Sequence, residues 1–349
     1  MPGIRRRSLF GPYGGGTLNG TIGACASGVR ARSPHSSPAR CPLRAALLLG
    51  GVKKSRRLSL KPAAGLPRVS GFGGRRDLQW SGSPRVRLIS WNVNGRRGPA
   101  LSRQLAVVRE RGADMVALQE IRAESLGVWR EGLKHAGLEH VLDSSGLLAV
   151  PSLSGREYRR IYFNVVASRW PLRRLPGLRL EFPERYLAVS VGRAGAEFEL
   201  HVAHLPPGST RGPVKVEMFE ALHTRLATPC ERPRVLCGDL NTPRAERDDG
   251  TVEFWGARHP PHTERWDKAE RSVVLGLGEH DLPDVFRALN GYTATDASWL
   301  VRRGGQSWGR RYDHVFASRR LTPTACRYHH AWREQRLSDH SAIEADFAA

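Results

Sequence analysis

The segment VLCGDLNTP, residues 235–243, places an acid and an amide two residues apart at the end of an apolar run. In an extended strand, residues i and i+2 point to the same face, so Asp239 and Asn241 can converge on one ligand if the strand continues that far. Alternatively, the two residues only form the turn that ends the strand, because Asp and Asn before Thr-Pro are common turn formers. The segment is therefore a candidate for acid–base or metal chemistry, with the turn as the open alternative.

A carboxylate and two amides follow the ends of two other apolar runs. Glu120 ends MVALQE, where an unpaired buried carboxylate would be costly, so it requires hydrogen-bond donors or a hard cation such as Mg²⁺. Asn92 and Asn94 fall on one face of a predicted strand in SWNVNG, and their amides could bind a metal or hold a carboxylate. The alternatives are a Glu120 that reaches solvent or pairs with Arg122, and amides that only serve the turn at Gly95.

Two histidines and two further acids lie beside other predicted strand ends. Asp339 and His340, in SDHSAI, immediately precede a strand and could form an acid–base or metal-ligand pair. Asp313, in RYDHVFAS, could orient His340 through its ring N–H and favour the imidazolium. His204, in HVAHLPP, could contact a phosphate or donate a proton. The alternatives are a strand-start cap for Asp339 and surface or packed positions for the others.

Hydrophobic periodicity and turn residues predict the elements that would position these side chains. The predicted strands are residues 85–93, 114–121, 146–152, 160–168, 185–191, 197–205, 234–240, 312–318 and 341–347. The predicted helices are residues 99–112, 125–137 and 214–227. Successive strands without intervening helices indicate antiparallel pairing, and strands punctuated by helices favour an α+β sandwich in which helices cover packed sheets.

The basic charge is concentrated at the N-terminus. Of the formal net charge of +22, residues 1–76 contribute +15, since they hold 15 Lys and Arg and no acid, and the remainder contributes +7. Residues 1–84 are rich in Gly, Pro, Ser and Arg, which predicts a disordered tail. An organelle transit peptide, a DNA-binding arm and an over-extended translation start remain as explanations of this tail.

The five cysteines are scattered and form no C-x-x-C pair, which favours a reducing compartment. No apolar run approaches the roughly 18 to 20 residues that span a bilayer, so no membrane association is expected. We expect a soluble monomer, in the cytoplasm and associated with the nucleoid if the source is bacterial.

Eight segments, in order, resemble exonuclease III-like (apurinic/apyrimidinic endonuclease-type) members of the endonuclease/exonuclease/phosphatase superfamily. They are ISWNVNG, VALQEIR, FNVVASRWPL, HVAHLPPGS, VLCGDLNTP, LPDVFR, RRYDHVFAS and LSDHSAI. The resemblance implies a catalytic domain at residues 85–349 with a deoxyribonuclease I-like four-layer α/β sandwich, two packed mixed sheets flanked by helices. It also implies Mg²⁺-dependent phosphodiester hydrolysis, with Mn²⁺ as a substitute ion.

The resemblance also implies roles for single residues. Glu120 would be the principal Mg²⁺ ligand, Asp239 would orient or deprotonate the attacking water, and Asn241 would stabilise the developing charge. The residues implied at the metal are Asn92, Asn94, Glu120, Asp239, Asn241, Asp339 and His340. The residues implied in catalysis are His204, Asp239, Asn241, Asp313 and His340. One departure is His204, which stands where exonuclease III-type enzymes carry a tyrosine.

Arginine pairs, two of them close to tryptophans, suggest the substrate. The pairs are Arg159/Arg160, Arg173/Arg174, Arg302/Arg303 and Arg310/Arg311. Arginine beside tryptophan suits phosphate contacts with base stacking, although a GC-rich genome and solvated strand edges would give the same pattern. The predicted nucleic-acid contacts are Trp299, Arg302, Arg303, Trp308, Arg310 and Arg311.

These features together favour a Mg²⁺-dependent nuclease acting on DNA, expected to be duplex DNA, of the DNA-repair type. The alternative is a superfamily phosphatase or phosphodiesterase that acts on RNA, a lipid headgroup or a small molecule. A third hypothesis is a nucleic-acid-binding protein that has lost catalysis.

Overall fold

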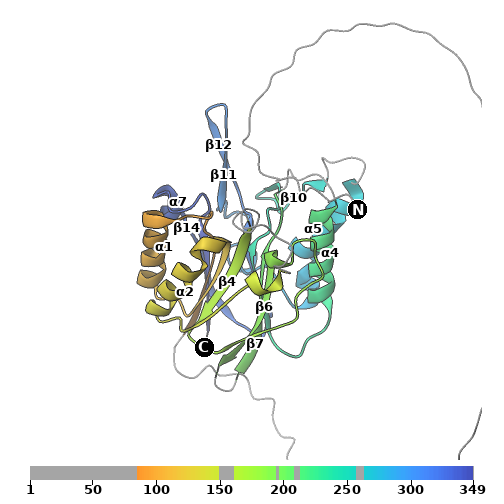
Figure 1. Cartoon of the computed structure of the whole chain (residues 1–349). Helices are drawn as coiled ribbons and strands as arrows, with labels where there is room; N and C mark the ends of the chain where they lie inside the picture. Colours follow the sequence, from red (N-terminus) through yellow and green to blue (C-terminus); the bar gives the residue numbers. More distant parts are fainter. Residues whose placement is uncertain (1–84, 149–160, 194–195, 208–212, 257–262, 349) are drawn as a thin grey trace, which may run out of the picture. The chain divides into compact units, whose positions relative to one another are not determined.

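The computed structural model describes residues 85–148, 161–193, 196–207, 213–256 and 263–348 (Figure 1). The tail predicted at residues 1–84 lies outside these ranges, as do Arg159 and Arg160. In the described ranges, no helix combines the length and the apolar character that crossing a membrane requires.

The first sheet is mixed and has six strands in the order β14-β15-β1-β2-β4-β3. Its strands are β1 (Arg85–Asn92), β2 (Met115–Arg122), β3 (His140–Asp143), β4 (Tyr162–Ser168), β14 (Pro323–His329) and β15 (Ala342–Ala348). β1 and β2 run parallel, whereas β15 pairs antiparallel with β1. The ends of β1 and β2 therefore meet at the same edge.

The second sheet has five strands in the order β13-β8-β7-β6-β5. Its strands are β5 (Leu172–Arg174), β6 (Tyr186–Arg193), β7 (Ala196–His204), β8 (Arg234–Asp239) and β13 (Asp313–Ala317). β7 and β8 run parallel, and β13 is antiparallel to β8, so β13 begins where β7 and β8 end. The described residues also form two short ribbons: β9 (Ala245–Glu246) with β10 (Val252–Glu253), and β11 (Trp299–Arg303) with β12 (Gln306–Arg310).

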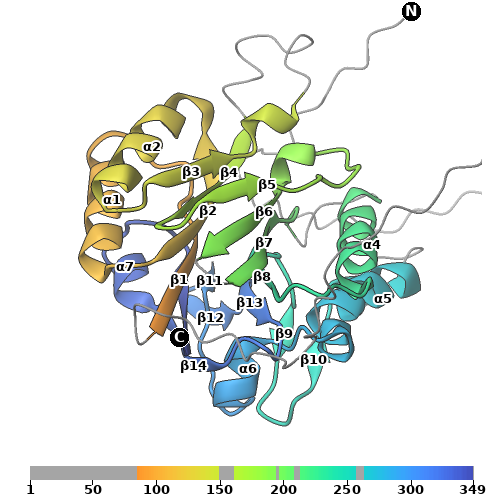
Figure 2. The same ribbon diagram turned by 90° about the horizontal axis from the view of Figure 1, so that it is seen from below.

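Helices cover the outer face of each sheet (Figure 2). The first sheet is covered by α1 (Gly98–Arg111), α2 (Leu126–His135) and α7 (His330–Glu334), and the second by α4 (Val214–Ala227) and α5 (Thr263–Val274). The short helix α6 (Val285–Asn290) contributes Phe286 to the core between the sheets. α1 ends at Gly112, as predicted, with a φ of 64°, the left-handed conformation that glycine adopts without strain.

The layers follow from alternation along the strands. In β1, Val86 and Leu88 pack into the core between the sheets, while Ile89 and Trp91 pack under the helices. Both faces of the strand are buried, so it is apolar on both sides rather than on alternate residues. The predicted four-layer α/β sandwich is confirmed.

One predicted strand is wrong in the part that the structure describes. Residues 145–147 form a 3-10 turn (η2, Ser145–Leu147), the rest of the strand predicted at 146–152 lies outside the described residues, and the strand in this region is β3. The apolar run GLLAV suggested a buried strand, but Leu147 and Leu148 are only half-buried, whereas His140 to Asp143 pair with β4. The position of this strand is determined by its pairing with β4, which cannot be read from the sequence.

Candidate active site

The side chains that the sequence selected come together where the two sheets end. Asn92 ends β1, Glu120 lies near the end of β2, and His204 and Asp239 end β7 and β8. In the second sheet His204 and Asp313 are the register neighbours of Asp239 on either side. Residues separated by more than 200 positions in the chain thus share one site.

Asn92 connects the two sheets through its side-chain amide. Its Nδ2 donates to Glu120 Oε1 at 3.1 Å and to Asp239 Oδ2 at 2.9 Å. The strand face predicted for Asn92 and Asn94 is wrong, because β1 stops at Asn92 and Asn94 has a φ of 52°. The backbone N–H of Asn94 instead donates to Asn92 Oδ1 at 2.9 Å, which fixes the amide with its nitrogen toward the carboxylates.

Asp239 and Asn241 converge through a turn rather than along a strand. β8 ends at Asp239, and Asn241 has a φ of 50°. Asn241 donates from its backbone N–H to Asp239 Oδ1 at 2.9 Å and from Nδ2 to Asp239 Oδ2 at 3.2 Å and Leu205 O at 3.0 Å. The segment is therefore a turn, as the plainer alternative held, and the turn itself brings the acid and the amide together.

Two donors, a buried lysine and a half-buried tryptophan, hold the strained backbone of Asn241. Its carbonyl accepts from Lys215 Nζ at 2.9 Å and from Trp255 Nε1 at 3.1 Å. Lys215 also pairs with Glu270 at 2.9 Å, and both side chains are fully buried. The sequence contained a signal for this, since Lys215 stands in the same helical stripe as Phe219, and a lysine in an apolar stripe needs a buried partner.

Replacing Lys215 with methionine is expected to reduce both stability and turnover. The variant leaves Glu270 buried without its cation, which costs about 3–5 kcal/mol, and removes one of the two donors to Asn241. Adding Glu270→Gln removes the stray charge, so the double variant should regain stability in urea unfolding while kcat stays at least about tenfold low. If the double variant recovers both its stability and its kcat, Lys215 contributes to folding and not to turnover.

Glu120 lies at an irregularity of β2, where the register with β4 shifts between Leu118 and Ile121. Its φ is 60°, a conformation that a non-glycine residue adopts at a cost and that concentrates at functional sites. Its Oε1 lies 3.4 Å from His204 Nε2. Burial alone would raise the pKa of Glu120, but the hydrogen bond and charge of His204, with the Asn92 amide, lower it to about 2. The carboxylate is therefore ionised and available to a cation.

His340 is held between two acids. Its Nδ1 lies 2.7 Å from Asp313 Oδ2, and its Nε2 lies 3.8 Å from Asp239 Oδ2. Burial opposes ionisation of the ring, but the charges of Asp313 and Asp239 outweigh it and raise the pKa of His340 well above its ordinary value. Burial, together with the charge of Asp313, raises the pKa of Asp239 despite the opposing charge of His340. The site thus contains an imidazolium beside a carboxylate of increased basicity.

Asp339 stands outside this buried group, but its charge still acts on His340, where it favours the imidazolium. Asp339 is exposed, and its Oδ1 accepts from Ser338 Oγ at 3.4 Å. Ser338 Oγ also donates to the backbone carbonyl of Asn92 at 2.7 Å, so Asp339 stands beside the end of β1. Its predicted role at the metal, like that of Asn94, stays a prediction.

Sequence reasoning missed Arg185, which precedes β6. Tyr186 pairs with Ala203, so Arg185 lies opposite His204 at the same sheet end. Its Nη1 is buried and has no hydrogen-bond partner among the described residues. Burial lowers the pKa of Arg185, while the charges of Glu120, Glu184 and Asp239 act in the opposite direction. No local motif marks this arginine, because only the pairing of β6 with β7 brings it to the site.

The donor set fits a hard divalent cation. Among the residues that the structure describes, two groups have ligand atoms within 4.8 Å of one another, Glu120 with His204 and Asp239, and Asp239 with Asp313 and His340. In the second group His340 is already bound to Asp313. In the first, two carboxylates are held together by a neutral amide, an arrangement that needs positive charge and offers the oxygen ligands that Mg²⁺ and Mn²⁺ accept.

The predicted nucleic-acid residues divide into exposed and buried ones. Arg302, Arg303 and Trp308 are exposed on the β11–β12 ribbon, and Trp308 is 40% exposed. Arg310 is half-buried, with its guanidinium 4.6 Å from the centre of the Trp255 ring. The pair Arg173/Arg174 lies on β5, where Arg173 pairs with Glu197 and Arg174 donates to Asp143 O.

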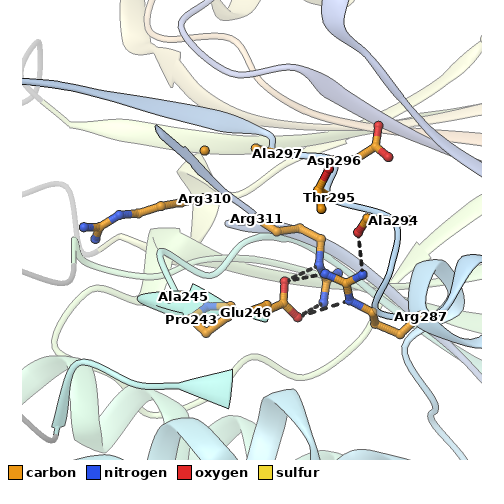
Figure 3. Close-up of a pocket in the computed structure, with 11 residues that line it drawn as sticks. Pro243, Ala245, Glu246, Arg287, Ala294, Thr295, Asp296, Ala297, Arg310 and Arg311 are labelled. Atoms are coloured by element: carbon orange, nitrogen blue, oxygen red, sulfur yellow. Dashed lines mark hydrogen bonds and ion pairs between the residues drawn. The ribbon is translucent and has the colours of Figure 1, made fainter. Parts of the chain in front are cut away.

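The prediction that Arg311 contacts a nucleic acid is wrong, because its side chain is buried, with 3% of the residue exposed. Its guanidinium pairs with Asp284 at 2.8 Å and with Glu246 at 2.7 Å. Arg287 shares the same Glu246 carboxylate, as Figure 3 shows. A cavity of about 220 Å³ borders these residues. In Figure 3 Arg310 extends away from Glu246. The two adjacent arginines therefore have different partners, Trp255 for Arg310 and Glu246 for Arg311.

Replacing Glu246 with glutamine is expected to lower the free energy of unfolding by about 3–5 kcal/mol at neutral pH, since it leaves two buried guanidiniums underpaired. Burial alone would raise the pKa of Glu246, but Arg311 and Arg287 lower it to about 2 from 4.5. A lowered pKa in the folded state means that this stabilisation is present above pH 4.5 and is lost as the pH falls towards 2.

Urea unfolding of the wild type and of Glu246→Gln at both ends of that range measures this prediction. The control is Glu253→Gln in the adjacent strand, whose partially exposed ion pairs are worth about 1 kcal/mol or less. Equal and small losses for the two variants would show that the buried pair does not stabilise the fold.

A family model and several solved structures match most of the described region. The sequence model of the Endonuclease/Exonuclease/phosphatase family matches residues 89–340. An AP endonuclease from Archaeoglobus fulgidus has 19% sequence identity and a TM-score of 0.58, over 76% of this chain and 100% of that one. The 3′ phosphatase NExo from Neisseria, bound to product DNA hairpin, has 19% identity and a TM-score of 0.54, with the same coverage of both chains.

A TDP2 structure from D. rerio, complexed with single strand DNA product, has 15% identity and a TM-score of 0.53, and the match covers 76% of this chain and 100% of that one. At identities this low, the likeness to these structures establishes the fold. It confirms the predicted deoxyribonuclease I-like sandwich.

Proposed function

The chain belongs to the endonuclease/exonuclease/phosphatase family, and we propose that it is a Mg²⁺-dependent hydrolase of phosphodiester bonds in DNA. The observation that carries the proposal is the single point at which Asn92 bridges Glu120 and Asp239, with the His340 imidazolium 3.8 Å from the same Asp239 oxygen. Carboxylates for a cation, a basic carboxylate and a cationic donor are the groups that phosphodiester hydrolysis requires.

A divalent cation held by Glu120, with Asp239 and Asn92 beside it, would neutralise the negative charge of the phosphate and so permit attack. Asp239 would then orient a water molecule and accept its proton, for which its raised pKa suits it. The water oxygen bonds to phosphorus, the ester P–O bond breaks, and the leaving oxygen takes up a proton. The products are a phosphomonoester and a hydroxyl, with no covalent enzyme intermediate.

The remaining groups would stabilise the phosphate as its charge grows. The Nε2 proton of His340, fixed by Asp313, is directed toward Asp239. Asn241 Nδ2 donates to Leu205 O and Asp239 Oδ2, so it would donate to a phosphate by giving up one of these two contacts. Arg185 adds a guanidinium with an unused donor at the same sheet end. Preorganised donors of this kind contribute most when they are buried and need no reorganisation.

DNA is the proposed substrate, in an exonuclease III-like repair role. Two of the similar structures carry DNA in their descriptions, a single strand product in one and a hairpin product in the other. The order of the eight motifs and the exposed arginines of the β11–β12 ribbon support the same choice. The phosphatase alternative retains support from the 3′ phosphatase among the similar structures.

Incubation of the purified protein with nicked, abasic, intact and single-stranded DNA, with RNA and with small phosphoesters, tests the proposal. Each substrate is assayed with Mg²⁺, with Mn²⁺ and with a chelator. Metal-dependent cleavage of DNA is expected. Release of phosphate from small esters alone would favour the phosphatase, and retention of DNA without turnover would favour a binding protein.

A further inference from the structure

The β11–β12 ribbon is the most prominent projection of the described domain, and Figure 1 shows it standing away from both sheets. From residue 299 to residue 310 it contains three arginines and no acid. Trp308, in the middle register pair of the ribbon, is exposed, although a large indole is usually covered. A basic ribbon with an uncovered aromatic ring has the composition of a nucleic-acid contact, and the hydrolytic site does not use it.

The strand register sorts the ribbon into two faces, because directly paired residues share a face and neighbours along a strand alternate. Val301 pairs with Trp308 and Arg303 with Gln306, and Trp299 pairs with Arg310. These six residues form one face, called here the tryptophan face. Arg302 pairs with Ser307 on the opposite face, where its charge acts on Arg333 of α7.

The tryptophan face leads to the active site. At its base the Arg310 guanidinium lies over Trp255, whose Nε1 donates to the carbonyl of Asn241. Trp299 stacks on Tyr312 with ring centres 5.6 Å apart and forms a backbone bridge with His340. A strand leaving the scissile phosphate along this face would pass Arg310 first, then Trp308 and Arg303.

We propose that the tryptophan face binds unpaired nucleic acid, with one base stacked on Trp308 and phosphates on Arg303 and Arg310. The site then selects substrates in which the strand beside the scissile phosphate is single-stranded. The choice of an unpaired strand follows from the indole, because an interior base of a duplex is already stacked on both sides and cannot cover an exposed ring. This inference rests on the proposed hydrolysis of DNA and names the form of that DNA.

Fluorescence anisotropy with labelled DNA in the presence of a chelator measures binding without turnover. The probes are a single strand, a blunt duplex of the same sequence and a duplex with an unpaired tail. Trp308→Ala is expected to weaken binding of the single strand and of the tailed duplex at least about tenfold, and Trp308→Phe to retain most of it, because a phenyl ring still stacks. Binding of the blunt duplex should change little.

The arginines provide a matched control within the ribbon. Arg303→Ala should reduce the slope of log K against log salt for the single strand by about 0.7, the contribution of one phosphate contact. Arg302→Ala removes the same charge from the opposite face and should leave the slope nearly unchanged. Equal effects of the two variants, or a larger loss of blunt-duplex than of single-strand binding in Trp308→Ala, would overturn the proposal.

Cleavage by the wild type distinguishes this result from failure of the proposed function. If the wild type cleaves DNA with metal but Trp308→Ala binds and cleaves the tailed duplex normally, the ribbon inference is wrong and the hydrolase stands. If the wild type cleaves no DNA under any condition, the proposed function itself is wrong.

Discussion

Asp239→Asn is expected to lower kcat by roughly three orders of magnitude, within the range that loss of a general base costs. The substituted amide cannot accept the proton of the attacking water. In the wild type, Asn92 Nδ2 and Asn241 Nδ2 both donate to Asp239 Oδ2. The substituted amide places an N–H₂ group against these donors, so the hydrogen bonds are lost as well. Steady-state cleavage of the preferred DNA with saturating Mg²⁺ measures the effect.

The affinity for DNA should not fall together with kcat. Removing a negative charge beside the phosphate should leave DNA affinity in chelator unchanged or stronger, so the defect belongs to the chemical step. Asp248→Asn, an exposed acid in the loop that follows, is the control and should behave as the wild type. Equal loss of kcat and of affinity in Asp239→Asn, or a normal kcat, would exclude Asp239 as the base.

Glu120→Gln is expected to raise the Mg²⁺ concentration that half-saturates cleavage by at least about 100-fold. Loss of a charged ligand should weaken metal binding more than loss of a residue that only supports a ligand. The glutamine keeps the shape but removes the charge, and the ionised state of Glu120, with its pKa lowered to about 2, is what a cation would bind. Cleavage rate against Mg²⁺ concentration measures the half-saturating value for the wild type and the variant.

Glu124→Gln is the matched control, because Glu124 lies four residues further along, is exposed and pairs with Arg97 outside the site. It should leave the metal requirement as it is in the wild type. An unchanged requirement for Mg²⁺ in Glu120→Gln would show that Glu120 does not bind the cation.

The sequence predicted most of the fold because its strands and helices carry strong periodicity. The strand before Asn92, the helix that ends at Gly112 and the strand before Asp239 all lie where apolar runs and turn residues placed them. The β11–β12 ribbon was missed, since its exposed and arginine-rich strands have no apolar alternation. An element that packs only at its base leaves little hydrophobic pattern to read.

The candidate site was predicted as a set of residues, but its geometry was not. Asn94, Glu120 and Asn241 all have positive φ, so the regular strand geometry assumed at these positions does not hold. The turn at Asn241 depends on the buried Lys215, which becomes a neighbour only when α4 packs on the second sheet. Arg311 was misjudged because its partners, Glu246 and Asp284, come from distant segments.

Anomalous diffraction from crystals grown with Mn²⁺ tests the central claim most directly. The predicted result is a strong peak about 2 Å from a carboxylate oxygen of Glu120, with Asp239 beside it and the His340–Asp313 pair intact. The same map shows whether Asn94 or Asp339 joins the ion. Strong peaks only at exposed acids such as Asp249, with none at Glu120, would contradict the account.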